Sequence, residues 1–311
     1  MKYNILLIGL GQLGSRYLQG LLCVETIELN IDVLEPNKVA YEKGIGVAAE
    51  GGYGLHVVKR VDQSTFHTSY DLAIVATSAA PRVEVIEHVA KHSDIRSWIL
   101  EKVLAQSETG IQRIESSLKD SQVWVNTPRR ITSLYKELRR VLGNNSHIEV
   151  EVKLPKFALG CNTIHFLDLV VWLSGSSIKN VSIAAATGWY EATRSGYQEF
   201  DGEVRAEYSN GSVLRIDNTY SGPGVIKCKT SQGLASIDET SGFSFNDVFH
   251  SGRVEFQSEL TSGIIERIFG SDFEDFLPTL AVSAKQHRMF LQAVINNKTL
   301  GESIGQLVPI T

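Results

Sequence analysis

The hydrophobic pattern of the first 125 residues alternates between short apolar runs and longer stretches in which apolar residues recur at helical spacing. Such alternation predicts parallel strands joined by helices. The expected strands lie near 3–8, 28–34, 71–76, 96–100 and 122–125, and helices such as 82–92 and 108–119 separate them. The first part of the chain should therefore form a doubly wound α/β domain around a parallel sheet.

Beyond about residue 126 the pattern becomes that of an α+β domain. Helices are expected near 133–142, 164–173 and 280–295, and strands near 147–153, 178–187, 225–230 and 234–238. A hairpin is expected over 204–216, where the pair Asn210-Gly211 suits a type I′ turn. The stretch 241–276 gives no clear pattern. We predict two domains, 1–125 and 126–311, the second built on a large, mostly antiparallel open sheet.

The composition and net charge indicate a globular protein that does not bind nucleic acid. The 311 residues are 43% hydrophobic and 21% charged, with a net charge of −5. These values are typical of a globular protein and argue against nucleic acid as a partner, because a nucleic-acid binder normally has a basic face. No signal peptide or membrane span is visible, so we expect a cytoplasmic protein without a membrane partner. Three scattered cysteines without a C-x-x-C pair predict reduced thiols and no metal site.

The strongest motif is G-x-G-x-x-G at Gly9, Gly11 and Gly14, between an apolar strand and a stretch compatible with a helix. In a dinucleotide site the first glycine permits a tight turn, the second lets the backbone approach a pyrophosphate, and the third lets the helix pack closely. Glu35 ends the next apolar strand, near the position where a carboxylate binds the adenosine ribose. The alternative is a glycine-rich turn without a ligand.

Glu35 also favours NAD over NADP, because a carboxylate repels the additional phosphate of NADP. Lys38 is the one cation that follows closely, and it weakens this preference. Thr77 and Ser78 come directly after the buried strand 71–76, where small polar residues suit a passing dinucleotide.

Lys102 follows the strand 96–100, at the carboxyl edge of the predicted sheet. A lysine there can move a proton to or from a substrate hydroxyl. The alternative is a lysine at an exposed strand end.

His165 and Asp168 are three residues apart on a predicted helix and should share one face. We expect an imidazole–carboxylate pair, in which Asp168 fixes the tautomer and His165 binds a substrate oxygen or relays its proton. A structural contact is the alternative.

These segments, in this order and over essentially the whole chain, resemble the glucose-fructose oxidoreductase and inositol dehydrogenase family (Gfo/Idh/MocA). The resemblance rests on the glycine motif, Thr77-Ser78, Glu101-Lys102, and His165 with Asp168. It implies a Rossmann domain, a nicotinamide cofactor, hydride transfer to or from a sugar or polyol carbon, and homodimers or homotetramers formed through the second sheet. It also implies that Lys102 and His165 contact the substrate or act in catalysis.

From the motifs and the resemblance together, the expected cofactor-binding residues are Gly9, Gly11, Gln12, Leu13, Gly14, Glu35, Thr77, Ser78, Glu101 and Lys102. The expected catalytic residues are Lys102, His165 and Asp168, and the expected substrate-binding residues are Lys102, Arg129, Asn162 and His165. Arg129 and Arg130 follow the last parallel strand, where one of the two guanidinium groups could clamp a carboxylate or phosphate of the substrate.

The chain departs from the family pattern at two positions. Val103 replaces the proline that follows the lysine, which alters only local rigidity. Cys161 stands four residues before His165, where the family usually has an aspartate, and this puts a proton relay through that aspartate in doubt. Asn162 could orient a substrate hydroxyl but cannot act as a base at neutral pH.

The first hypothesis is an NAD-dependent dehydrogenase or reductase acting on a secondary hydroxyl or ketone of a sugar derivative. The segment 160–168 and Pro309-Ile310-Thr311 resemble a branch of the family found in surface-polysaccharide and nucleotide-sugar pathways, so the substrate could be a sugar acid or a nucleotide-sugar. The second hypothesis is a non-catalytic dinucleotide-binding sensor or scaffold. A third is a reductase of a tetrapyrrole or an imine, which explains Lys102 and His165 less directly.

Overall fold

The chain folds into two compact units. A computed structural model describes residues 2–49, 56–62, 65–143 and 147–311. The first unit comprises Met1–Glu101, Gln112–Asn126 and Glu255–Leu280, and the second comprises Lys102–Ile111, Thr127–Val254 and Ala281–Thr311. A single division after residue 125 is therefore too simple, because Lys102–Ile111 folds with the second unit and Glu255–Leu280 with the first.

The first unit contains a sheet of six parallel strands in the order β3-β2-β1-β4-β5-β6. The strands are β1 (Lys2–Ile8), β2 (Glu28–Leu34), β3 (Val57–Val61), β4 (Ser69–Val75), β5 (Asp94–Glu101) and β6 (Gln122–Asn126). The sequence analysis missed β3 because this short edge strand is largely exposed and lacks an apolar run. The parallel doubly wound sheet is otherwise as predicted.

The order of the strands indicates where this sheet could bind a ligand. β1 and β4 are neighbours in the sheet, but the chain continues from β1 to β2 on the other side. Strand order thus reverses between β1 and β4, and a crevice at the carboxyl ends of such strands is where doubly wound sheets bind ligands. Gly9 and Thr77 lie at these two strand ends.

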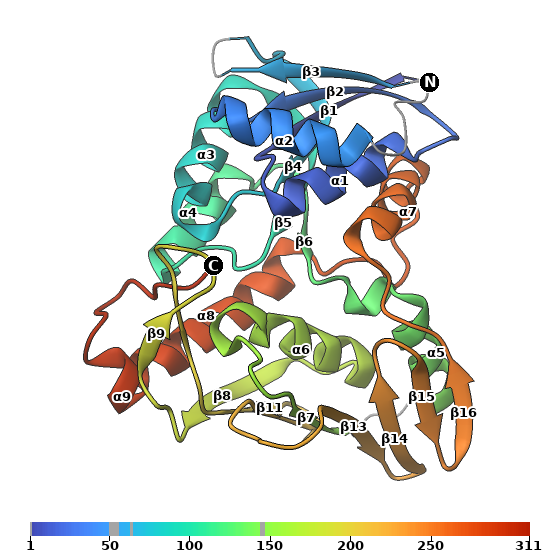
Figure 1. Cartoon of the computed structure of the whole chain (residues 1–311), viewed down its shortest axis with the longest axis vertical. Helices are drawn as coiled ribbons and strands as arrows, with labels where there is room; N and C mark the ends of the chain where they lie inside the picture. Colours follow the sequence, from blue (N-terminus) through green and yellow to red (C-terminus); the bar gives the residue numbers. More distant parts are fainter. Residues whose placement is uncertain (1, 50–55, 63–64, 144–146) are drawn as a thin grey trace. The chain divides into compact units, whose positions relative to one another are not determined.

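Helices connect the parallel strands, and one later helix returns to them. α1 (Gln12–Leu22), α2 (Lys38–Ala49), α3 (Ala79–His92) and α4 (Glu108–Ser117) follow β1, β2, β4 and β5 respectively. α7 (Gln257–Gly270) comes from the stretch 241–276 and packs beside α1 (Figure 1). Gly20 makes this packing close, because a Cβ there would lie 2.4 Å from the Ser258 carbonyl oxygen.

The second unit is built on an eight-stranded sheet in the order β16-β15-β14-β13-β7-β12-β11-β8. Its strands are β7 (Glu149–Lys153), β8 (Ile178–Ala184), β11 (Glu203–Tyr208), β12 (Val213–Asp217), β13 (Val225–Thr230), β14 (Gly233–Asp238), β15 (Gly242–Phe245) and β16 (Val248–Ser251). Only the β7–β12 pair is parallel among these described strands, so the sheet is mostly antiparallel, as predicted.

Helices and a small hairpin complete this unit. They are η1 (Pro128–Ile131), α5 (Ser133–Leu142), α6 (Leu159–Ser174), α8 (Leu280–Asn296), α9 (Lys298–Gly301), and the hairpin of β9 (Trp189–Glu191) with β10 (Gln198–Phe200). α6 contacts β10, β11 and β12, and twelve of its sixteen residues are buried. It begins at Leu159, five residues before the predicted start, so Cys161 and Asn162 lie in its first turn.

Two local predictions were wrong or incomplete. The turn between β11 and β12 is not type I′, because Gly211 has a φ of 86° but Asn210 is not among the residues with positive φ. A type I′ turn requires positive φ at both central residues. The stretch 241–276 contains β15, β16 and α7, whose short strands and weakly amphipathic helix give little periodic signal.

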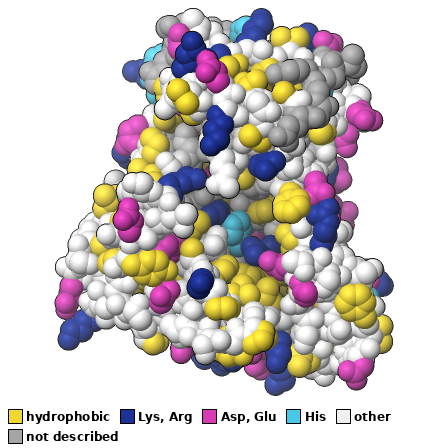
Figure 2. Space-filling view, viewed as in Figure 1, with side chains coloured by type: hydrophobic (Ala, Val, Ile, Leu, Met, Phe, Trp, Pro, Cys, Tyr) yellow, Lys and Arg dark blue, Asp and Glu magenta, His cyan; other side chains and the backbone are white. Residues whose placement is uncertain are grey.

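The surface carries charges of both signs. Lys and Arg are interspersed with Asp and Glu over the face drawn in Figure 2, in keeping with the net charge of −5. Of the helices described by the structure, none is long and apolar enough to cross a membrane.

The α1–α7 packing yields a stability prediction. Gly20→Ala should lower the free energy of unfolding by about 1–3 kcal/mol, because the new methyl group would overlap the α7 backbone. Gly263→Ala in α7 is the matched control: a Cβ there meets nothing within 4 Å, so stability should rise by about 0.5–1 kcal/mol. Urea denaturation of both variants measures the difference, and equal effects would contradict this account of the packing.

Candidate dinucleotide and proton-transfer sites

The glycine turn after β1 has the geometry that a dinucleotide requires. Gly9 has a φ of 87°, which favours glycine, and its N–H donates to the Leu34 carbonyl oxygen at 2.9 Å. A Cβ on Gly14 would lie 2.1 Å from the Gly9 carbonyl oxygen, so only glycine fits there. A Cβ on Gly11 would meet nothing within 4 Å, which leaves open space above the turn.

The N-terminus of α1 faces this space. Gly11 is its N-cap and provides no side-chain hydrogen bond, and Gln12 and Leu13 form the first turn. The N–H groups of a first helical turn and the helix dipole favour an anion. The residues present therefore fit the pyrophosphate of a dinucleotide.

Glu35 is oriented by the backbone of the same region. Its Oε2 accepts a hydrogen bond from the Leu10 N–H and its Oε1 accepts one from the Asn37 N–H, both at 2.9 Å. The half-buried carboxylate is thus fixed at the carboxyl end of β2 while retaining capacity to accept further hydrogen bonds.

Arg60 is a neighbour of Glu35 that the sequence analysis did not identify. Its guanidinium donates to the carbonyl oxygens of Glu35 and Pro36 and lies 5.5 Å from the centre of the Tyr41 ring. The parallel register pairs Arg60 with Val33 on β2, although the two are far apart in sequence. A second cation, besides Lys38, therefore lies near the end of β2.

Thr77 and Ser78 lie at the end of β4, next to the glycine turn. A Cβ on Gly9 would lie 3.2 Å from the Thr77 nitrogen, which shows how closely the two segments approach. Ser78 is the N-cap of α3 but makes no side-chain capping bond. The buried hydroxyl oxygen of Thr77 has no hydrogen-bond partner among the described residues. Both side chains suit a polar ligand.

Glu101 is an interior residue of the first unit and is only 3% exposed. Its Oε1 accepts hydrogen bonds from the Tyr17 hydroxyl and the Asn126 amide, both at 2.6 Å. Burial and the neighbouring carboxylate raise the pKa of Tyr17 well above its usual value. These contacts link α1 with the ends of β5 and β6.

Lys102 is held by Cys161 within the second unit. Its Nζ lies 2.8 Å from the Cys161 Sγ and donates a hydrogen bond to the Cys161 carbonyl oxygen at 3.1 Å. The Lys102–Val103 peptide bond is cis. The cysteine that replaces the aspartate of the family pattern is therefore the residue that the lysine contacts.

His165 lies one turn after Cys161 on α6, among cationic groups. Burial and the charges of Arg129, Lys102 and His287 lower its pKa well below the usual 6.5. Its Nδ1 is buried and has no hydrogen-bond partner among the described residues. His165 is therefore neutral at physiological pH and can exchange hydrogen bonds with a ligand without carrying charge.

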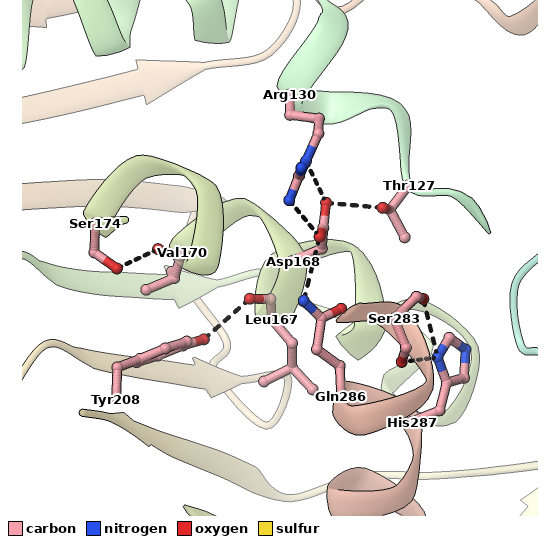
Figure 3. A network of polar contacts seen from close by, with 10 residues as sticks. All are labelled: Thr127, Arg130, Leu167, Asp168, Val170, Ser174, Tyr208, Ser283, Gln286 and His287. Atoms are coloured by element: carbon pink, nitrogen blue, oxygen red, sulfur yellow. Dashed lines mark hydrogen bonds and ion pairs between the residues drawn. The ribbon is translucent and has the colours of Figure 1, made fainter. Parts of the chain in front are cut away.

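The predicted pairing of His165 with Asp168 is wrong. The Asp168 carboxylate instead accepts hydrogen bonds from Thr127 at 2.8 Å and from Gln286 at 3.2 Å, and it pairs with two nitrogens of Arg130 at 2.9 and 2.6 Å (Figure 3). Asp168 is 1% exposed, and burial raises its pKa while Arg130, Thr127 and Gln286 oppose that effect. This network joins η1, α6 and α8.

Arg129 is engaged by a carboxylate of its own unit. Its Nε and one terminal nitrogen contact the Glu239 carboxylate at 2.7 and 3.0 Å, and its guanidinium lies 4.4 Å from the centre of the Phe166 ring. The Tyr135 hydroxyl donates to the same carboxylate. A substrate anion would have to share Arg129 with Glu239 or displace it.

Glu199 is a charged residue near Lys102 that the sequence analysis missed. It lies on β10, is 5% exposed, and accepts hydrogen bonds from the N–H groups of Gly160 and Cys161. Burial raises its pKa to about 7, although the two backbone bonds and Lys102 oppose this. No sequence motif links it to α6, because the contact depends on how the hairpin folds back.

Asn162 is the remaining residue of the predicted substrate site. Asn162 lies half-buried beside Cys161 in the first turn of α6. Among the described residues, no group of three or more His, Cys, Asp or Glu side chains is arranged to hold a metal ion.

This chain is similar to known proteins in structure but not in sequence. The sequence matches no protein-family model and no curated protein sequence. The structure is similar to UDP-N-acetylglucosamine 3-dehydrogenase GnnA from Acidithiobacillus ferrooxidans, with a TM-score of 0.70 and 13% identity over 94% of this chain and 97% of that one. The chain has the fold of Gfo/Idh/MocA-type oxidoreductases.

Two other solved structures share this Gfo/Idh/MocA fold. An oxidoreductase from Agrobacterium radiobacter, solved with NAD+, L-tartaric acid and magnesium, has a TM-score of 0.67 and 13% identity over 95% of this chain and 97% of that one. The transcriptional regulator Gal80p from Kluyveromyces lactis has a TM-score of 0.69 and 14% identity over 93% and 90%. The fold alone therefore does not decide between an enzyme and a regulator.

The Asp168 network predicts a large loss of stability when it is broken. Asp168→Ala should lower the free energy of unfolding by about 3–5 kcal/mol, because it leaves Arg130 buried without its carboxylate. The exposed ion pair of Arg205 and Glu207 provides the contrast, since Glu207→Ala should cost about 0–1 kcal/mol. Chemical denaturation compares the two, and similar costs would show that Asp168 does not support the fold in this way.

The lowered pKa of His165 predicts a pH effect on stability. Below about pH 6.5 the unfolded chain binds a proton at His165 that the folded chain does not, so this group makes stability fall with decreasing pH. Between about pH 7.5 and about pH 5, the free energy of unfolding should therefore fall by about 1–2 kcal/mol less in His165→Gln than in the unaltered protein. Denaturation at both pH values measures this difference. The exposed His147, changed to Gln, is the control, and an effect as large in that variant would refute the assignment to His165.

Proposed function

We propose that the protein is an NAD-dependent oxidoreductase that transfers a hydride between the cofactor and a secondary hydroxyl or ketone of a sugar derivative. The observation that carries this proposal is the gathering of Lys102 and a neutral His165 around the first turns of α6. A structural role alone does not require a lysine and a histidine to share this partly exposed region. An acid–base reaction at a hydroxyl requires both a mobile proton and a hydrogen-bonding partner.

The cofactor is held by the first unit in this proposal. The glycine turn and the N-terminus of α1 bind the pyrophosphate, and Glu35 accepts hydrogen bonds from the adenosine ribose. Glu35 favours NAD, whereas Lys38 and Arg60 are cations that could receive an additional phosphate. When bound, the nicotinamide accepts or delivers the hydride.

The second unit supplies the proton chemistry. Lys102 Nζ takes the proton from the substrate hydroxyl during oxidation, or returns it to the carbonyl oxygen during reduction. His165 stays neutral and orients the same oxygen by a hydrogen bond, because burial and the surrounding cations disfavour its protonation. Asp168 acts only by fixing α6 through Arg130 and Gln286.

Two structures with the same fold, together with the charges around Arg129, support a neutral, polyhydroxylated substrate. A dehydrogenase of a nucleotide-sugar and an oxidoreductase crystallised with tartaric acid share this fold, which supports a polyhydroxylated substrate. Asn162 and Arg129 are the proposed side chains for its further oxygen atoms. Because Glu239 already pairs with Arg129, a neutral sugar ring fits better there than a strongly anionic group. We further propose a cytoplasmic homodimer or homotetramer.

A second candidate function is a dinucleotide-binding sensor or scaffold. Two observations favour it: Cys161 replaces the aspartate of the family pattern, and the regulator Gal80p shares the fold. Such a protein would bind NADH without consuming it.

The first experiment changes the lysine. Lys102→Met should reduce kcat by about 10²–10⁴-fold, because it removes the proton donor or acceptor. NADH affinity, measured by fluorescence titration, should stay within about twofold because the glycine turn and Glu35 are untouched. Turnover is followed by NADH absorbance with a panel of nucleotide-sugars, neutral sugars and sugar acids.

The outcomes separate the two candidates. Turnover that is lost in Lys102→Met and kept in the exposed-surface control Lys179→Met supports the enzyme. Undiminished turnover in Lys102→Met would remove the proposed role of the lysine. Tight NADH binding without turnover across the panel would favour the sensor.

A further inference from the structure

A buried carboxylate stands at the N-terminus of α6, next to the contact between Lys102 and Cys161. Glu199 Oε2 accepts a hydrogen bond from the Gly160 N–H at 2.6 Å, and Oε1 accepts one from the Cys161 N–H at 2.9 Å. The two oxygens thus satisfy two of the N–H groups that the start of a helix leaves without an intrahelical partner. Glu199 belongs to β10, so the contact joins two separate elements.

The fit around Gly160 is tight on both sides. A Cβ on Gly160 would lie 2.8 Å from Glu199 Oε2 and 2.6 Å from the Ile310 Cγ2. Ile310 is fully buried, and its carbonyl oxygen accepts a hydrogen bond from the Gln106 amide. The Pro309 carbonyl accepts one from the Gln198 N–H, beside Glu199. The backbone of 160–161 is therefore clamped between β10 and the segment 308–311.

The clamped backbone in turn holds the lysine. Both Cys161 atoms that contact Lys102 Nζ, the carbonyl oxygen and Sγ, belong to the residue whose N–H Glu199 binds. We propose that Glu199 is a positioning residue for Lys102: its carboxylate fixes Cys161, which contacts the lysine Nζ through its carbonyl oxygen and Sγ, and it places a negative charge in the neighbourhood of the lysine ammonium. The proposal deepens the proposed function, on which its consequence for catalysis rests.

Glu199 thereby supplies a carboxylate that the first turn of α6 lacks in its own sequence. The first turn of α6 has a cysteine at position 161 and no carboxylate of its own. The negative charge comes instead from another strand and reaches the same helix turn. A carboxylate near an ammonium stabilises its protonated form, an effect that is strongest where water is excluded.

The charged and titratable groups around Glu199 come from several elements. Lys102 and Cys161 face it from the lysine segment and α6, and Tyr190 and Asp201 from the β9–β10 hairpin. Lys102 favours the carboxylate form, whereas burial and Asp201 oppose it and bring the pKa of Glu199 to about 7. The negative charge beside Lys102 therefore increases as the pH rises through neutrality.

The test uses Glu199→Gln, which keeps the size of the side chain and removes its charge. In protein labelled with ¹³C at lysine Cε, the Lys102 resonance is assigned by its absence from Lys102→Met, and its pH titration gives the lysine pKa. Glu199→Gln should lower that pKa, because the ammonium loses a neighbouring negative charge. This measurement needs neither cofactor nor substrate.

Glu191→Gln is the matched control. Glu191 lies on β9, is exposed, and pairs in register with Gln198, next to Glu199 on the same hairpin. The change is chemically identical but remote from α6, so the Lys102 titration should stay as in the unaltered protein. Glu199→Asp keeps the charge with a shorter side chain, and its Lys102 pKa should lie between those of the unaltered protein and Glu199→Gln.

A kinetic readout tests the catalytic consequence. In the oxidative direction, the pH–rate limb that reports deprotonation of Lys102 should move to lower pH by the same amount in Glu199→Gln, and remain in place in Glu191→Gln. A Lys102 pKa unchanged in both Glu199 variants would overturn the proposal. A lowered pKa without turnover on any substrate would instead support the role of Glu199 while rejecting the dehydrogenase function.

Discussion

The buried ion pair between Asp168 and Arg130 is the interaction on which the arrangement of the second unit depends. A carboxylate that is 1% exposed is tolerable only when its charge is compensated, and Arg130, Thr127 and Gln286 provide that compensation from η1 and α8. Since Asp168 lies on α6, the network fixes the rotation of this helix about its axis. That rotation decides which side chains of the first turns remain accessible.

The residues around the first turns of α6 form a cationic neighbourhood with a neutral histidine. Burial, together with the charges of Arg129 and Lys102, keeps the imidazole of His165 unprotonated. Glu239, which follows β14, pairs with Arg129, and the charge of Lys102 acts on Glu199, which lies on β10. The first turn of α6 carries no carboxylate of its own, and Glu199 supplies one there by accepting hydrogen bonds from the Gly160 and Cys161 N–H groups.

In the first unit, backbone contacts and hydrogen bonds shape the proposed dinucleotide site. Gly14 and Gly9 touch through the backbone, whereas Gly11 borders open space at the helix N-terminus. Glu35 is fixed by two backbone N–H groups before any ligand binds. The site is therefore preorganised by contacts that also hold the fold together.

The sequence by itself determined the elements that have strong periodicity, including the buried strands, α5 and the glycine motif, because local spacing decides them. It also indicated that Lys102 follows a parallel strand and that His165 lies on a helix. It could not show that Asp168 turns away from His165, since an i,i+3 spacing permits a contact without requiring it, and Arg130 and Gln286 compete from other elements. Only the tertiary structure shows that Glu199 contacts the start of α6 and that Arg60 lies at the end of β2. A hairpin and a parallel register bring these residues to α6 and β2, and such long-range pairing leaves no trace in local sequence.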